Sequence, residues 1–328
     1  MRWWPELWRR RARDWIAQPL RGDQVPGGVD PAPATPDVYL SVFLASMRVV
    51  DVRRGLSRFY GAVDSTISVP HVVEGVVDYH VVTTPGELKK VDAKHLDRVV
   101  QFERRLLGPV PYRGGDVAME IGLFSIKEDN LAGAFLELLE QLSNLAGVGV
   151  VSSAMAFAAP LVRGIELLTG SADAAMLEVG LAGEWSTPST GYLLAMRAPR
   201  DRVDVGALRV EGGNNEVRDG KGQIVGKYPY ILLRIETATK RDDWHQIPSL
   251  RAAYAVLLEE VRRGRRNAAT AALATFQRTA KVCPDLLPQD GARLAELVRE
   301  EVRTALPAAQ MGATSQELPK LERLPLFA

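Results

Sequence analysis

The chain has 328 residues, of which 46% are hydrophobic and 25% are charged, an ordinary globular composition with enough apolar material for a sizeable core. Its 41 lysines and arginines nearly balance 40 aspartates and glutamates, so the molecule lacks a net field that would attract nucleic acid or an anionic membrane. The single cysteine, Cys283, excludes an intramolecular disulfide and suits a reducing compartment. We therefore expect a cytoplasmic protein of one large domain or two smaller ones.

The first fifteen residues hold four of the six tryptophans and five arginines. On a helix that turns roughly 100° per residue, most of the aromatic residues gather on one side and most of the basic residues on the other. Residues 1–20 are therefore predicted to form an amphipathic helix that docks on another surface. Six arginines against Glu6 and Asp14 give residues 1–21 a charge of about +4, leaving about −3 for the rest. The predicted docking residues are Trp3, Trp4, Trp8 and Trp15, with Arg9, Arg10 and Arg13 as electrostatic support.

Residues 21–36, RGDQVPGGVDPAPATP, combine Pro, Gly and Asp with little that can join a core, which predicts a linker. Such a linker would detach the helix, which then either folds back on its own body or reaches a partner subunit, a second copy or a membrane surface. Arg9 to Arg11 interrupt the apolar run that a signal peptide requires, so we expect none.

Residues 37–247 are predicted to be mainly strands. Tyr39 to Val52 is a nearly continuous apolar run that predicts a central strand, and Val117 to Ile126 alternates in a way that buries one face. Further strand candidates are 62–69, 76–83, 98–106, 177–181, 192–197 and 230–237. Seven or eight short strands with many turns favour an antiparallel β-sandwich.

A helical hairpin is predicted to interrupt this sandwich at about residues 130–170, where leucines recur at spacings of three and four. Residues 141–162 carry no charge, and their length alone would cross a bilayer core. They also contain Gln, Asn, Ser, Gly and Pro, which favours a helix buried within the protein over a membrane span. The alternative is a hairpin over residues 131–169 that leaves its buried position and inserts into a membrane.

The last third, residues 248–307, is predicted to form three helices, and residues 308–328 an extended, proline-rich tail. The predicted fold class is thus α+β: an antiparallel β-sandwich interrupted by a helical hairpin, with a C-terminal helical bundle and an N-terminal amphipathic helix.

Signs of catalysis are sparse. The four histidines lack the spacing of a zinc site, and no nucleophile elbow, phosphate loop or zinc-protease motif occurs, so we predict no metal and no cofactor. His80 lies in a predicted strand and shares a face with Asp78, with Asp64 as another possible neighbour. A second polar group, Asp242, Asp243 and His245, lies between the predicted strands and helices and is more typical of helix capping and salt bridges.

These observations favour a non-catalytic interaction or assembly protein over an enzyme. Its N-terminal helix would dock on a partner subunit, in a homo-oligomer or with another protein, or on a membrane surface, while nucleic acid is disfavoured. Two alternatives remain: a membrane-active, pore-forming effector that uses residues 131–169, and a hydrolase that uses His80 or the group at Asp242, Asp243 and His245.

Overall fold

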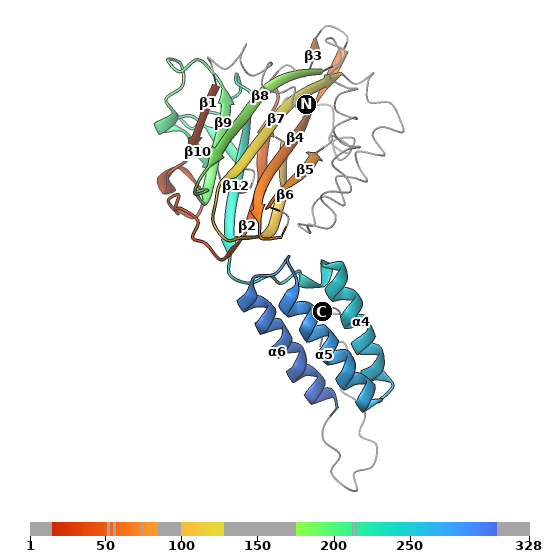
Figure 1. Cartoon of the computed structure of the whole chain (residues 1–328). Helices are drawn as coiled ribbons and strands as arrows, with labels where there is room; N and C mark the ends of the chain where they lie inside the picture. The colour runs from red at the N-terminus through yellow and green to blue at the C-terminus, as the bar shows by residue number, and fades with distance from the viewer. Residues whose placement is uncertain are drawn as a thin grey trace. The chain divides into compact units, whose positions relative to one another are not determined.

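The computed structural model describes residues 15–50, 53–54, 57–73, 75–83, 100–127, 175–211, 213 and 215–306 (Figure 1). Over these residues it is an α+β protein with antiparallel sheets and three α-helices. Contacts divide the chain into two compact units, Met1–Thr237 and Ala238–Ala328. Among the described residues, the strands belong almost wholly to the first unit and the three α-helices to the second. β12 ends at Ala238 and the first described α-helix begins at Pro248.

The first sheet has the order β1-β9-β12-β2-β6. β1 pairs with β9, β9 with β12, and β2 with β6, each time antiparallel. The predicted central strand at Tyr39 is confirmed, because β2 lies between β12 and β6, although it ends before Val52. The bounds are β1 Trp15–Pro19, β2 Val38–Arg48, β6 Val100–Tyr112, β9 Gly191–Arg197 and β12 Tyr230–Ala238.

The second sheet has the order β3-β4-β7-β8, and β5 pairs with β4. The described pairs are all antiparallel. A short separate sheet pairs β10 with β11. The bounds are β3 Arg53–Arg54, β4 Ser57–His71, β5 Gly75–Thr83, β7 Val117–Lys127, β8 Ala175–Trp185, β10 Arg209–Glu211 and β11 Glu216–Arg218.

Both sheets contribute to one buried hydrophobic cluster. Alternate residues of β4, β7 and β8, among them Ile67, Ile121 and Val179, join residues of β2 and β12 such as Val42 and Ile231. This is the pattern expected when successive side chains of a strand point to opposite faces. The other face of the first sheet buries a second cluster that includes β10 and β11 residues, so β12 is covered on both sides. The first four residues of β12, Tyr230 to Leu233, are accordingly all apolar and buried.

One charged contact links the two sheets. Glu178 of β8 is almost fully buried, and its carboxylate accepts hydrogen bonds from Ser125 Oγ of β7 and Arg197 Nη2 of β9, both at 2.8 Å. Arg197 also donates to the Leu177 carbonyl oxygen at 3.4 Å. Because β9 belongs to the first sheet and β7 and β8 to the second, these bonds join the sheets at one end of the shared core.

The second unit contains the helices α4 (Pro248–Arg262), α5 (Arg266–Val282) and α6 (Pro288–Ala305). Trp244, in a short 3₁₀ turn before α4, contacts Tyr254 of α4 and Phe276 of α5, with ring centroids 5.2 and 5.7 Å apart. This aromatic cluster anchors α4 to α5. Among the described helices none is both long and apolar enough to cross a bilayer.

The predicted helix over residues 1–20 is wrong for its last part, because Trp15–Pro19 form β1. The segment predicted as a linker is not detached from the body: Gln24 is buried, and its Nε2 donates to the carbonyl oxygens of Val205 at 2.8 Å and Leu208 at 3.0 Å. Hydrogen bonds to residues far away in the sequence therefore attach this segment to the body, although its Pro and Gly content predicts a detached linker. Outside the described residues lie Trp3, Trp4, Trp8, Arg9, Arg10 and Arg13, the whole of the predicted hairpin at about 130–170, and the predicted tail from Ala308.

Candidate functional site

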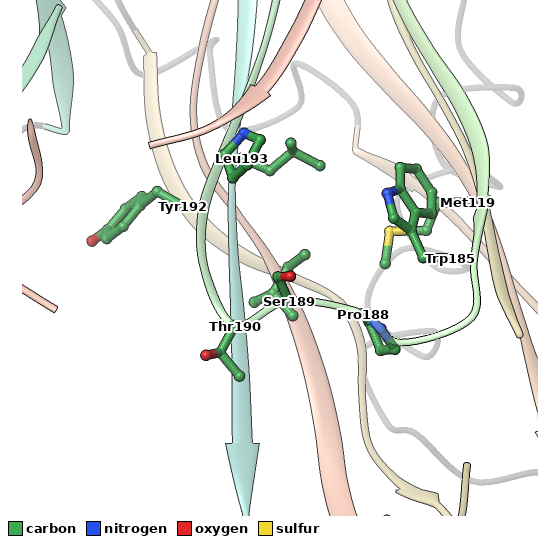
Figure 2. A pocket seen from close by; sticks show the side chains of 9 residues that line it. Met119, Trp185, Pro188, Ser189, Thr190, Tyr192 and Leu193 are labelled. Atoms are coloured by element: carbon green, nitrogen blue, oxygen red, sulfur yellow. The ribbon is translucent and has the colours of Figure 1, made fainter. Parts of the chain in front are cut away.

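A small apolar cavity lies where β8 passes into β9 (Figure 2). Its volume is about 60 Å³. It is bounded by the end of β1, the start of β7, the end of β8 and its following loop, and parts of β9 and β12. The residues that line it are Pro19, Met119, Trp185, Pro188, Ser189, Thr190, Tyr192, Leu193 and Ile235.

A glycine in β8 sets the position of the largest wall residue. Gly183 and Trp185 are two apart on the strand and share a face, and a Cβ at Gly183 would lie 2.9 Å from the Trp185 ring. The missing side chain therefore leaves room for the indole beside the strand. Figure 2 shows Trp185 next to Met119, with Leu193 directed toward them from β9. The cavity thus has an aromatic wall and an aliphatic wall.

The segment predicted as a linker fixes the rim of the cavity. Ala34 N–H donates to the Pro188 carbonyl oxygen, and Thr190 N–H donates to the Ala32 carbonyl oxygen, both at 2.8 Å. Pro33 also forms an isolated bridge with Ser189. These bonds hold residues 186–190 against residues 31–34, so the site is formed before any occupant arrives.

The chemistry of the lining suits an apolar occupant. No Asp, Glu, His, Lys or Arg lines the cavity, and the ionisable group there is Tyr192. Burial raises the pKa of the Tyr192 phenol above its usual value. Thr190 Oγ1 donates to the Ala32 carbonyl oxygen at 3.1 Å. These side chains offer neither a general base nor an activated nucleophile, and the volume is far below that of a typical small-molecule pocket.

An exposed apolar tip lies at the same end of the second sheet. Val72 and Val73, in the turn between β4 and β5, are 69% and 74% exposed, and Val76 of β5 is 62% exposed. Val73 N–H donates to Nδ1 of His71 at 3.3 Å. Strand pairs Ser68–Ala118 and Val117–Trp185 place the end of β4 and the end of β8 at one end of this sheet. We call Val72, Val73 and Val76 the valine tip. Sequence reasoning did not identify it, because only exposure distinguishes these valines from core valines.

The structure places His80 on the face of the second sheet opposite the shared core. Its Nδ1 lies 2.8 Å from Thr66 Oγ1 on the neighbouring strand. Asp78, two residues earlier, accepts a hydrogen bond from Ser68 Oγ at 2.5 Å. The sequence prediction that Asp78 shares a face with His80 fits this register. Thr66 and Ser68 were missed, since they belong to another strand and only the pairing of β4 with β5 reveals them.

Asp64 shares this face and is 6% exposed. Its β4 position is two residues before Thr66, and its partner on β7 is Gly122. Burial raises the pKa of the Asp64 carboxyl to about 7, and the negative charge of Glu120 adds to the shift. Asp64 is therefore largely protonated below neutral pH. This face combines a protonatable carboxyl with a hydroxyl–imidazole pair, but the cavity is lined by none of them.

Asp242, Asp243 and His245 lie in the second unit, where Asp243 and His245 contact neighbouring side chains. Arg241, whose side chain is fully buried, donates from Nε to Asp243 at 2.8 Å, and its backbone N–H donates to Asp290 at 2.9 Å. The His245 ring meets the Trp244 ring edge-on at 6.2 Å. Asp242 is exposed. The Arg241 backbone thus connects the segment before α4 to the start of α6, and Asp243 binds the Arg241 side chain.

In the part of the chain that the structure describes, no group of three or more His, Cys, Asp or Glu side chains is arranged to hold a metal ion. The chain matches no protein-family model, no curated protein and no solved structure.

Proposed function

We propose that this chain is a non-catalytic interaction and assembly protein that docks a partner subunit through its aromatic–basic segment, residues 1–15. The observation that carries the proposal is β1, which pairs with β9 from Trp15–Arg197 to Pro19–Leu193. Because Trp15 is held in the sheet, the segment is joined to the folded body by a paired strand and not by a tether. Its tryptophans and arginines are the residue types that dominate binding energy at protein interfaces.

The finer fold forms part of the same proposal. The two large sheets share one buried cluster, which supports a β-sandwich. Aromatic contacts join α4 to α5, and Gln277 of α5 donates to the Ala295 carbonyl oxygen of α6 at 3.3 Å, which supports a three-helix bundle. A scaffold of this kind presents docking segments at fixed places.

We expect the side chains of residues 1–15 to make the contact with the partner. We do not expect a strand of the partner to add to the edge of β1. β1 is the terminal strand in the sheet order. Leu20 N–H donates to the Tyr192 carbonyl oxygen on β9, and backbone groups alternate between the two sides of a strand. Pro19, which lacks an N–H, therefore lies where a donor would face outward, and proline at such a place opposes pairing with another strand. Docking by tryptophan side chains is consistent with this blocked edge.

Charge favours a second copy as the partner. The six arginines of residues 1–21 against two acidic residues give about +4, and the rest of the chain carries about −3. A basic segment from one copy is therefore attracted to the body of another. Anionic lipids at a membrane surface would attract the same basic segment. Docking on such a membrane is the second outcome of the test.

The test replaces Trp3, Trp4 and Trp8 together by alanine in the full chain, which leaves β1 in place. Sedimentation is expected to show a lower oligomeric mass than that of the wild type. A matched control replaces the exposed Val256 and Val282 of the helices by alanine and should leave the mass unchanged. Removal of everything before Asp37 is unsuitable, because it also removes β1 and the buried Gln24.

A tryptophan variant with the wild-type oligomeric mass contradicts docking on a partner subunit. If that variant keeps its mass but no longer floats with vesicles of anionic phospholipid, the segment docks on a membrane surface instead. A matched variant with Arg9, Arg10 and Arg13 changed to glutamine should weaken oligomer formation in a salt-dependent way.

A further inference from the structure

We infer that the cavity beside Trp185 receives Val73 of the valine tip from a second copy of this chain, so that two copies meet end to end. This contact is separate from the aromatic–basic segment. It involves side chains that the structure describes in full, within the first unit of each copy.

The size of the cavity fits one branched aliphatic side chain. A cavity of roughly 150 Å³ holds a benzene ring, so by proportion one of about 60 Å³ takes two or three carbon atoms. The isopropyl group of valine has three. The Trp185, Met119 and Leu193 side chains supply apolar contacts, and no charged side chain in the lining would lose its solvation.

The tip offers the matching surface. Its three valines cluster around one turn and are more than half exposed. Val73 is the most exposed of them at 74%, so it does not occupy the cavity of its own copy. The hydrogen bond from its N–H to His71 holds the turn that presents it.

The placement of the two features permits a closed pair. The tip follows the end of β4, and the cavity lies at the end of β8, at one end of the same sheet. A two-fold axis can therefore bring the tip of each copy to the cavity of the other, which is the symmetry of most homodimers. A substitution at the tip or in the cavity then changes two contacts in the dimer.

The test mixes two single-cysteine variants of the full chain, each carrying Cys283→Ala. One carries Val73→Cys and the other Ser189→Cys, because Ser189 lies on the cavity rim and is exposed. Under mild oxidation we expect a disulfide-linked heterodimer. A control mixture replaces the second variant by Arg202→Cys, an exposed position beyond the opposite end of β9. Heterodimer formation no faster than in this control overturns the inference.

A second measurement uses the nearly isosteric Val73→Thr, which keeps the shape of the side chain but adds a hydroxyl. We expect the dimer dissociation constant to rise at least tenfold, and an unchanged constant contradicts the inference. Repeating the cysteine test in the variant lacking Trp3, Trp4 and Trp8 separates this contact from the proposed function. A crosslink there shows that the tip and cavity meet even where the aromatic–basic segment has lost its anchors.

Discussion

Asp64 shows how a single buried residue can make stability depend on pH. Its folded-state pKa of about 7 lies above the ordinary value of 3.8, because burial disfavours the charged carboxylate. Between these two values the unfolded chain releases the proton while the folded chain keeps it. The free energy of unfolding therefore falls as pH rises from about 4 to about 7 and changes no further from this group above that.

We predict that Asp64→Asn removes this slope, because asparagine resembles the protonated carboxyl and does not ionise. Between pH 5 and pH 8 the wild type should lose up to about 3 kcal/mol relative to the variant, since each unit of pKa shift is worth about 1.4 kcal/mol. Urea unfolding at both pH values measures this difference. The exposed Asp201→Asn serves as control. Equal slopes in Asp64→Asn and wild type would refute the prediction.

The sequence revealed part of this polar face. It indicated that His80 and Asp78 share a face of one strand, because side chains alternate along a strand. It could not place Thr66 at 2.8 Å from His80, since that distance depends on which residue of β4 pairs with which residue of β5. The cavity depends on pairing as well, because its lining comes from five separate strands and one loop.

Among the secondary-structure elements, α6 approaches α5 unusually closely at Gly291. A Cβ there would lie 2.5 Å from the carbonyl oxygen of Ala280, well inside van der Waals contact. Two effects of adding a methyl group oppose each other. Helix propensity favours alanine over glycine by about 1 kcal/mol, whereas overpacking against a backbone atom costs about 1–3 kcal/mol.

We predict that Gly291→Ala lowers the stability of the second unit by about 1 kcal/mol, because the overlap outweighs the gain in propensity. Helical circular dichroism followed during thermal unfolding detects the loss. Arg299→Ala, at an exposed position of the same helix, should change stability by less than about 0.5 kcal/mol. A Gly291→Ala variant that is more stable than the wild type would show that the gain in helix propensity outweighs the overlap, contrary to the prediction.

Local pattern was a good guide to long elements and a poor guide to short ones. The runs at β2, β7 and β12 and the three helices have periodicities long enough to identify strand or helix. Trp15–Pro19 spans only five residues, so helical and strand periods cannot be told apart, and the pairing with β9 decides. The linker predicted over residues 21–36 was a different kind of error. Its Pro and Gly content does not reveal that Gln24 forms hydrogen bonds with distant residues.

At the scale of the whole molecule, the division into two units predicts that distant substitutions act independently. Arg197→Met removes the partner of the buried Glu178 carboxylate and should destabilise the first unit by about 3 kcal/mol. Combined with Gly291→Ala in the second unit, it should show a coupling energy below about 0.5 kcal/mol in a double-mutant cycle measured by calorimetry. A larger coupling would show that the two units stabilise each other.

The hydrogen bonds between residues 31–34 and the 186–190 loop determine what proteolysis of this part of the chain would do. The same stretch of chain supports the wall of the cavity and leads from the strand that holds the aromatic segment. A protease cutting between these two places would separate β1, and with it the cavity residue Pro19, from residues 31–34, whereas a cut just after residue 34 would separate residues 31–34 from β2. One short length of backbone therefore supports both proposed contact surfaces, and cleavage within it would affect both.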